Sequence, residues 1–365
     1  MIRLENNRID KILVKEYLKE IEFVVKNIEG LDDINSYRKE FEAGFARFLG
    51  AKYALAVNSG TDALQLALLA LGIGKGDAVI IPDLTYISTA LVVKYVLAEP
   101  ILVDVKKEDL TIDEAKIEKA ITPNTKAIIA VHMFGHPCNM GKLRVVAQKH
   151  NLYLIEDSCQ ALGSAYKDKY VGTFSDISAF SFSYYKPLSS LAGNGGMLVF
   201  NNNAYKDRIE KFINLWKTDI SLLEADRKFN KISLTDIATV KIKLKYINQI
   251  IESRNNAKKL YEENLLHLRY IEVFKDTKGF FSVRENYHIL AKDRDKLHAF
   301  LKKKGIDAEL PYPPMHTLKL FRKQNNTDFK ITEDYYNRGL HLPLYSFIKK
   351  EEMLEVVEAI REFYQ

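Results

Sequence analysis

Cysteine is scarce in this sequence of 365 residues, which contains only Cys138 and Cys159. Two cysteines supply neither a disulfide framework nor the spacing of a metal-binding motif, and we therefore expect no metal centre. Long hydrophobic runs are also missing, since no apolar stretch reaches the ~18 residues that a membrane-spanning helix needs. The first residues, Met1–Arg8, are polar and carry no hydrophobic signal-peptide segment. These absences predict a soluble, reduced, cytoplasmic protein without a membrane partner.

Charge of one sign is not concentrated anywhere in the chain. The 54 lysine and arginine residues exceed the 48 aspartate and glutamate residues by a net charge of +6, which is spread along the sequence. This mild excess, without a nucleic-acid-binding motif, argues against a nucleic-acid partner and leaves a modest bias toward anionic substrates. Hydrophobic residues make up 47% and charged residues 28%, as in ordinary globular proteins. The length suggests about two domains.

A glycine fingerprint for a dinucleotide is missing as well. The run Gly72–Gly76 resembles one, but it follows a helical pattern and precedes a strand-like one, which is the reverse of the required order. This argues against a nicotinamide-dependent oxidoreductase.

Strand-like and helical stretches alternate from about Ala51 to Phe200. This alternation predicts an α/β domain whose mostly parallel mixed sheet is flanked by helices on both faces. Ligands of such sheets bind at the carboxyl ends of the strands. The strand candidates are Tyr53–Val57, Ala78–Ile81, Ile101–Val105, Ala127–Val131, Leu152–Ile155, Ile177–Phe182 and Met197–Phe200.

The pattern changes from about Thr235 onward, and a smaller α+β domain is expected there. We assign residues 1–250 to a large domain with an N-terminal helical segment and residues 251–365 to a small C-terminal domain, joined through a long helix. The elements expected in this part are one long helix, Ile237–Leu260, a strand, Asn286–Ala291, and two further helices, Asp295–Lys304 and about Glu351–Phe363.

The turn Asn58–Asp62 lies between a strand and an apolar helix. A helix that begins at such a turn can hold a phosphate with its backbone N–H groups, here near Gly60, and with the hydroxyl of Thr61. The alternative is an ordinary turn with a capped helix, because Ser, Thr and Asp are good caps.

An acid and a lysine each follow a strand candidate, Asp157 after Leu152–Ile155 and Lys186 after Ile177–Phe182. A carboxylate ~4 Å from a pyridinium nitrogen contributes about 4 kcal/mol at an effective dielectric near 20, which keeps that nitrogen protonated. A lysine supplies the amine for a Schiff base. Taken singly, Asp157 could instead be a helix cap and Lys186 a surface lysine beside a turn.

Three further side chains complete a pattern that one cofactor explains. Tyr86 could stack on a planar ring, Gln160 could reach a ring hydroxyl, and Ser181 could bind a phosphate. A phosphate turn, a stacking ring, an acid, a hydroxyl and a lysine in this order predict pyridoxal 5'-phosphate.

The chain resembles the sugar aminotransferases of the DegT/StrS family, which have the aspartate aminotransferase (type I) fold of pyridoxal-phosphate enzymes. The resemblance extends over nearly the whole chain. The matching segments are Phe41-Glu42, Phe48–Gly50, Asn58–Thr61, Pro82–Thr89, Val131–Gly135, Glu156–Gly163, Val171–Thr173, Phe180–Lys186, Lys304–Ile306, Tyr312–His316 and Leu342–Leu344.

The resemblance implies a role for individual residues around the cofactor. Lys186 would be the Schiff-base lysine and proton shuttle, and Asp157 would pair with the pyridine nitrogen. Gln160 would contact the ring hydroxyl and Tyr86 would stack on the ring. The phosphate would be held by Gly60, Thr61 and Ser181.

The resemblance also implies a homodimer with shared active sites, because Asn230 matches the asparagine that reaches the phosphate of the neighbouring subunit. Tyr312 and His316 lie where the family builds its substrate pocket, and Tyr185 is a further candidate there. Tyr185 and Pro187 flank Lys186 where the family has other residues, so the sugar is not indicated. Relatives that replace the lysine with histidine are dehydratases, a branch that Lys186 argues against.

The expected function is the ping-pong transfer of an amino group from glutamate to a nucleotide-linked keto-sugar, in amino sugar or polysaccharide biosynthesis. Two alternatives stay open. The acceptor could be a keto-cyclitol or another non-nucleotide ketone, or the chain could be a non-catalytic pyridoxal-phosphate-binding regulatory protein.

Overall fold

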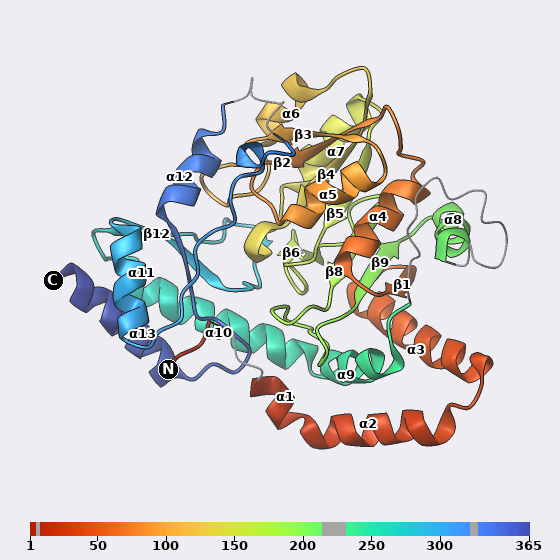
Figure 1. The fold of residues 1–365 in the computed structure, drawn as a ribbon, viewed down its shortest axis with the longest axis horizontal. Coiled ribbons are helices and arrows are strands. Elements are labelled where there is room, and N and C mark those ends of the chain that lie inside the picture. The colour runs from red at the N-terminus through yellow and green to blue at the C-terminus, as the bar shows by residue number, and fades with distance from the viewer. Residues whose placement is uncertain (5–7, 214–230, 322–327) are drawn as a thin grey trace.

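The computed structural model describes residues 1–4, 8–213, 231–321 and 328–365. Within these ranges a seven-stranded sheet forms the centre of the larger part of the molecule, in the order β1-β9-β8-β5-β4-β2-β3 (Figure 1). Its strands are β1 (Tyr53–Val57), β2 (Ala78–Pro82), β3 (Glu99–Val103), β4 (Thr125–Val131), β5 (Tyr153–Asp157), β8 (Ile177–Ser181) and β9 (Gly196–Phe200).

The sheet is mixed but mostly parallel, as expected. Strand β9 runs antiparallel to both of its neighbours, β1 and β8, and the other pairs are parallel. Strands β1 and β8 therefore point the same way as β5, and their carboxyl ends share one edge of the sheet. The strands read as continuous apolar runs because both faces are covered; all five residues of β2 are buried.

Helices cover both faces of this sheet. Val79 and Ile81 of β2 belong to the same apolar cluster as residues of α4 (Gly60–Ala70), α5 (Ile87–Tyr95) and α8 (Asn203–Ile213). Ile80, which alternates with them, packs in a cluster on the other face that includes residues of α6 (Glu114–Ala120) and α7 (Met140–Lys149). A third cluster joins β1, β8 and β9 to α3 (Leu31–Leu49) and α9 (Leu234–Lys245). This two-faced burial is what the alternating pattern predicted.

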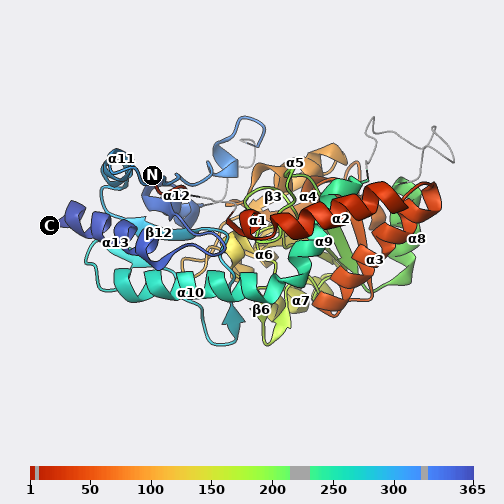
Figure 2. The same ribbon diagram turned by 90° about the horizontal axis from the view of Figure 1, so that it is seen from below.

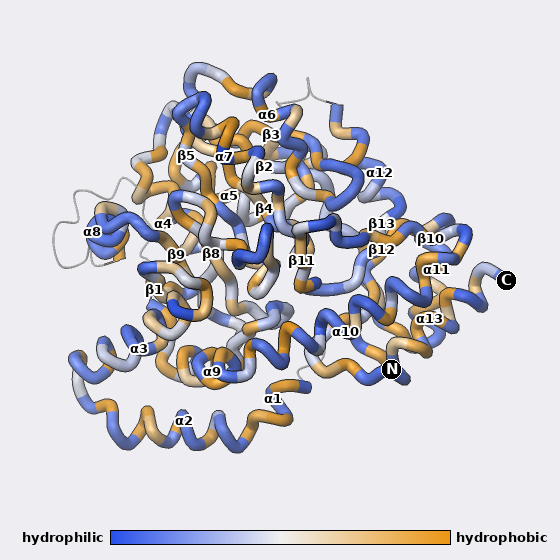
Figure 3. The backbone as a smooth tube through the Cα atoms, turned by 180° about the vertical axis from the view of Figure 1, so that it is seen from behind, coloured by the Kyte–Doolittle hydropathy of each residue, from blue (hydrophilic) through white to orange (hydrophobic). Residues whose placement is uncertain are grey.

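The N-terminal helices α1 (Arg8–Ile12) and α2 (Val14–Asn27) precede α3, and α2 packs along α9. Hydrophobic and hydrophilic residues alternate along α2 (Figure 3). The first residues, in contrast, join the smaller part of the molecule, because Ile2 donates to the carbonyl of Gly305 at 2.8 Å and accepts from Asp307 at 2.8 Å.

The smaller part contains a three-stranded antiparallel sheet, β10 (Ile271–Val273), β12 (Tyr287–Ala291) and β13 (Gly339–Leu342), in the order β10-β12-β13. Helix α10 (Ile247–Leu265) extends toward the C-terminal helix (Figure 2). The other helices of this part are α11 (Arg294–Lys303), α12 (Lys330–Arg338) and α13 (Lys350–Tyr364). A short three-stranded sheet, β11 (Phe280–Phe281), β6 (Ala165–Tyr166) and β7 (Lys169–Tyr170), joins the two parts.

The expected single helix Ile237–Leu260 is wrong, because the structure has two helices, α9 and α10, that meet at Tyr246. Tyr246 leaves the helical region, with φ −103° and ψ 11°, and serves as the end of one helix and the start of the next. Apolar spacing is the same on both sides of such a break, so the sequence pattern does not reveal it. The boundary that we assigned between residues 250 and 251 lies inside α10. In the described ranges, none of the helices has both the length and the apolarity that crossing a membrane requires.

Candidate active site

A cavity of about 450 Å³ lies at the carboxyl edge of the large sheet, where loops from the smaller part close over it. This is where an open α/β sheet places its ligands. The described residues that line it come from the ends of β1, β2, β4, β5 and β8, from α4 and α5, from the N-terminal segment and from two later segments of the smaller part. They are Leu4, Ser59, Gly60, Thr61, Leu64, Thr85, Tyr86, Ser88, Thr89, Val131, Asp157, Cys159, Gln160, Ser181, Ser183, Tyr184, Tyr185, Lys186, Glu285, Asn286, Glu309 and Tyr312.

One end of the cavity is the N-terminus of α4. Ser59 caps this helix, and its hydroxyl accepts a hydrogen bond of 3.0 Å from the N–H of Asp62. The N–H groups of Gly60 and Thr61 precede that bond and have no acceptor within the helix. A Cβ atom on Gly60 would lie 2.8 Å from Sγ of Cys159 and 2.9 Å from Cβ of Ser181. Glycine is therefore required for the helix end to approach Ser181, and the two together form a small cradle of donors that suits a phosphate.

Asp157, the last residue of β5, is buried, and two donors fix its carboxylate. Thr89 donates to Oδ2 at 2.9 Å, and the backbone N–H of Cys159 donates to Oδ1 at 3.2 Å. The Thr89 hydroxyl also lies 2.8 Å from the hydroxyl of Thr85. The acid thus reaches the cavity in a single orientation, as a partner for a pyridinium nitrogen must.

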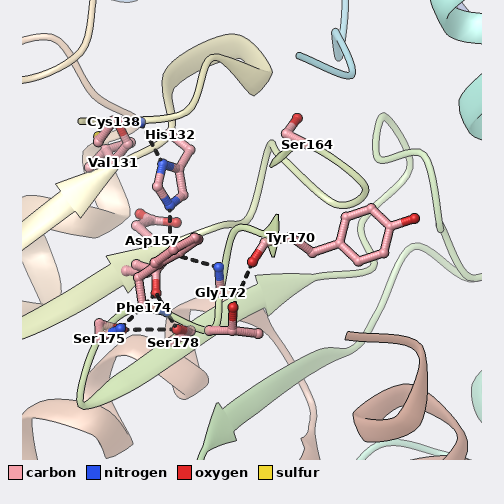
Figure 4. Close-up of polar contacts among 12 residues, drawn as sticks. Val131, His132, Cys138, Asp157, Ser164, Tyr170, Gly172, Phe174, Ser175 and Ser178 are labelled. Carbon is pink, nitrogen blue, oxygen red and sulfur yellow. Dashed lines mark hydrogen bonds and ion pairs between the residues drawn. The ribbon is translucent and has the colours of Figure 1, made fainter. Parts of the chain in front are cut away.

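The residue before it, Glu156, alternates with Asp157 along β5 and therefore faces the opposite side of the sheet. Figure 4 shows the polar contacts in this region, among them those of His132, Gly172 and Ser178. Oε2 of Glu156 lies 3.0 Å from Nε2 of His132 and accepts from the N–H of Gly172, and Oε1 accepts from the N–H groups of Phe174 and Ser175 and the hydroxyl of Ser178. Burial alone would raise the pKa of Glu156, but these donors outweigh it and lower the pKa below the ordinary value. A buried carboxylate with this many partners holds the strand end rigid.

Gln160 is buried, and its side-chain oxygen accepts a hydrogen bond of 2.7 Å from the N–H of Phe134. This bond sets the amide orientation and leaves Nε2 to donate on the cavity side. A donor there suits an oxygen substituent of a bound ring.

Lys186 reaches the cavity from the segment after β8 and forms an ion pair with Glu285, with Nζ and Oε1 2.6 Å apart. Burial lowers the pKa of Lys186, but the charge of Glu285 and this hydrogen bond outweigh it, so that the pKa is raised above the ordinary value. Sequence reasoning missed Glu285. It lies 99 residues from Lys186, and no local spacing could have connected the two.

Aromatic side chains form the outer wall. Tyr86 is half exposed, and its ring meets that of Tyr312 edge to face, with the centroids 5.6 Å apart. Tyr185 lines the same wall and is 53% exposed. The flat faces of such rings suit contact with a planar cofactor or with a sugar.

His316 is not among the described residues that line the cavity. Its Nδ1 lies 2.7 Å from Oδ2 of Asp83, its backbone N–H donates to Oδ1 of the same acid, and its ring stacks on Phe329. Asn230 lies outside the described residues. The structure therefore brings together Gly60, Thr61, Tyr86, Asp157, Gln160, Ser181, Tyr185, Lys186 and Tyr312, and it adds Thr89, Cys159, Glu285 and Glu309.

These residues fit pyridoxal phosphate. The cradle at Gly60 that a methyl group would fill, the fixed carboxylate of Asp157 and the amine of Lys186 line one cavity. They are the three groups that its phosphate, ring nitrogen and aldehyde require.

Comparisons with known proteins agree with this geometry. The model of the DegT/DnrJ/EryC1/StrS aminotransferase family matches residues 14–361. The chain is 35% identical over 353 residues to GDP-perosamine synthase of Escherichia coli O157:H7, a match that covers 95% of this chain and 96% of that protein.

Solved structures share the fold, and two of them show the degree of similarity. DesV of S. venezuelae, in complex with a ketimine intermediate, matches with a TM-score of 0.92 and 30% identity over 100% of this chain and 98% of its own. NtdA of Bacillus subtilis, with bound cofactor PMP, matches with a TM-score of 0.85 and 28% identity over 99% of this chain and 83% of its own.

Proposed function

The chain belongs to the DegT/DnrJ/EryC1/StrS aminotransferase family, and from this premise we propose that it transfers an amino group from glutamate to a nucleotide-linked keto-sugar. It is an aminotransferase of the type I fold, and its cofactor is pyridoxal phosphate. The similarity to a GDP-perosamine synthase over nearly the full length of both chains supports the sugar-nucleotide acceptor.

The observation that carries the proposal is the meeting of Lys186, Asp157 and the N-terminus of α4 in one cavity. When bound, pyridoxal phosphate supplies the electron-withdrawing ring through which an amino group passes from one carbonyl carbon to another. Asp157, held by Thr89, keeps the ring nitrogen protonated. Lys186 would take a proton from the carbon that carries the amine and then give that proton to the accepting carbon.

The remaining residues of the cavity bind and orient the cofactor and the substrate. The N–H groups of Gly60 and Thr61 and the hydroxyl of Ser181 hold the phosphate. Tyr86 covers the ring, and the Gln160 amide donates to the ring oxygen. Tyr185 and Tyr312 of the outer wall are the proposed substrate contacts. His316 was expected to join them, but it does not line the cavity and pairs with Asp83 instead.

We also propose a homodimer with shared active sites. Among the described residues that line the cavity, Lys186 is the only basic one, whereas Asp157, Glu285 and Glu309 are acidic. Glutamate and a nucleotide diphosphate are anionic and need cationic partners. A second subunit that contributes to the site would supply them, and Asn230 would add an uncharged donor for the phosphate. Exposed apolar side chains on α2, with Leu18 63% and Val25 75% exposed, offer surface for such contacts.

The cytoplasm is the proposed compartment, because neither Cys138 nor Cys159 is in a disulfide.

The test is the visible absorbance of the cofactor-loaded protein. We expect glutamate to bleach it and a keto-sugar linked to a nucleotide diphosphate to restore it, in two separable half-reactions. A matched panel of ketones without the nucleotide, including a keto-cyclitol, tests the other acceptor class. Restoration by those ketones alone would replace the sugar-nucleotide acceptor. If no amino donor changed the absorbance, the chain would be a pyridoxal-phosphate-binding protein without turnover.

A further inference from the structure

The ion pair between Lys186 and Glu285 crosses from one part of the molecule to the other. Lys186 belongs to the segment after β8 of the large sheet, and Glu285 to the loop before β12 of the small sheet. Nζ and Oε1 are 2.6 Å apart, and the two side chains are 13% and 5% exposed. The pair is therefore withdrawn from solvent, where a charge without a partner is expensive.

The loop that carries Glu285 is held in place from both sides. Arg254 of α10, itself buried, donates through NH1 to the carbonyls of Arg284 and Glu285, at 2.8 Å each, and through Nε to Ser346. The N–H of Val283 donates at 2.8 Å to the hydroxyl of Ser164 in the larger part. These bonds hold the backbone around Glu285 in place, and they therefore fix the position of its carboxylate at the site.

The second oxygen of Glu285, Oε2, has no donor among the described residues, although Glu285 lines the cavity. One oxygen thus holds the lysine and the other is open to the cavity. A carboxylate arranged in this way can accept a further proton donor, either a substrate hydroxyl or the lysine itself in a second position.

Other titratable groups that line the cavity have smaller effects on Lys186 than Glu285 has. Asp157 and Cys159 approach from β5, Glu309 and Tyr312 from the smaller part, and Tyr86 and Tyr185 from the loops at the outer wall. Glu285 makes the direct contact, and of these groups it has the largest effect on Lys186.

We propose that Glu285 is the positioning residue of the catalytic lysine: it stabilises the ammonium that Lys186 becomes on taking a proton from carbon. This inference rests on the proposed function, because it requires Lys186 to act as the base. In the step, a C–H bond breaks, its electron pair stays with the carbon, and the proton joins the lone pair of Nζ. The ammonium then gives the same proton to the accepting carbon, and Glu285 stays ionised throughout.

A neutral partner would leave that ammonium buried without a counter-charge, and proton transfer to Nζ would become less favourable. A strong ion pair also has an opposite effect at rest, because it holds Lys186 protonated and unreactive. Removing the charge should therefore make Lys186 of the cofactor-free chain more reactive, because more of it is unprotonated. It should also make Lys186 a poorer base during the reaction. A role limited to joining the two parts of the molecule would produce neither change.

The variant Glu285→Gln tests this, because glutamine keeps the size and a hydrogen-bond acceptor but removes the charge. In the full chain without added cofactor, the labelling of Lys186 by an amine-reactive anhydride is followed against pH by peptide mass spectrometry. We expect the midpoint to move to lower pH by at least one unit, which makes labelling near neutral pH about tenfold faster. Glu309→Gln removes a carboxylate from the same cavity without touching Lys186 and should leave the midpoint in place.

In the cofactor-loaded enzyme, Glu285→Gln should lower kcat with little change in KM, and the isotope effect with α-deuterated glutamate should rise. Glu285→Asp, which keeps the charge, should recover part of kcat. An unchanged labelling midpoint in Glu285→Gln would overturn the proposal, and so would an unchanged isotope effect. If Glu285→Gln lowered the melting temperature but changed neither the labelling midpoint nor the isotope effect, the ion pair would have only a structural role. If the wild type shows no transamination, the proposed function fails, while the labelling arm still decides whether Glu285 controls the lysine.

Discussion

Thr89 of α5 donates a hydrogen bond of 2.9 Å from Oγ1 to Oδ2 of Asp157 at the end of β5. The two residues are 68 positions apart in sequence. The contact joins a helix and a strand that approach the cavity from different directions, and it leaves the Asp157 carboxylate facing the site. The two residues should contribute differently to turnover, because Asp157 supplies a charge and Thr89 only orients it.

Replacing Asp157 by asparagine should lower turnover far more than replacing Thr89 by valine. Loss of the charge removes about 4 kcal/mol of support for the protonated ring, whereas loss of one neutral donor costs about 1 kcal/mol, or roughly fivefold. Steady-state kinetics of both variants measure this. The double variant should be no worse than Asp157→Asn, because Thr89 acts through Asp157. Thr235→Val, at an exposed threonine of α9, is the matched control. Equal losses in the two single variants would contradict the assignment.

Lys186→Ala should abolish amino transfer, with a fall of at least ~100-fold, because the base is lost. Borohydride reduction of the cofactor-loaded wild type, followed by peptide mapping, should place the cofactor on the peptide that contains Lys186. Lys142→Ala removes an exposed lysine and should react as the wild type does. Recovery of the reduced adduct on another lysine would refute the role.

Gly60→Ala should weaken cofactor retention, because the added Cβ would meet Cys159 and Ser181 at less than normal contact distance. Gly44→Ala offers a matched helical control, since the nearest atom there is 3.8 Å away, in Leu244. That change should raise stability by about 0.5–1 kcal/mol. Equilibrium dialysis of the cofactor and thermal unfolding separate the two effects. Undiminished retention in Gly60→Ala would show that the helix end does not hold the phosphate.

Tyr86→Leu should weaken cofactor binding by about 1 kcal/mol through the loss of ring stacking. Tyr86→Phe should bind normally, because stacking does not use the hydroxyl group. Fluorescence titration with the cofactor distinguishes the pair. If Tyr86→Phe bound the cofactor as weakly as Tyr86→Leu, the contribution of Tyr86 would come from its hydroxyl group and not from ring stacking.

Glu156→Gln should destabilise the fold by about 3 kcal/mol near neutral pH, because it leaves a buried set of donors without a charged acceptor. The pKa of Glu156 is lower in the folded chain than its ordinary value. Its contribution is therefore present above that ordinary value and is lost as the pH falls through the folded pKa. Urea unfolding at neutral and acidic pH should show the wild type and the variant converging in acid. Glu118→Gln, at a surface ion pair with Lys149, should change little at either pH. If the difference in unfolding free energy between the wild type and Glu156→Gln stayed constant across the pH range, the predicted loss of this contribution in acid would be wrong.

The sequence fixes features that arise from local patterns. Tyr53–Val57 was expected as a strand and is β1 to the residue, and Ile177–Phe182 differs from β8 only at its last position. These strands are apolar, short and bounded by turns, so their type follows from neighbouring residues alone. The acid, the phosphate turn and the lysine could be found for the same reason, since each ends or follows a strand whose end must lie at one edge of the sheet.

Long-range contacts decided the rest. The break at Tyr246 and the withdrawal of His316 onto Asp83 depend on how distant helices and loops pack. Glu285 is the strongest case: nothing near it in sequence marks it, and it meets Lys186 only because the smaller part of the molecule closes over the sheet edge. Sequence alone therefore determined which groups end the strands. The tertiary structure determined which charges face each other, because burial and Coulomb energy depend on distance in space and not on separation along the chain.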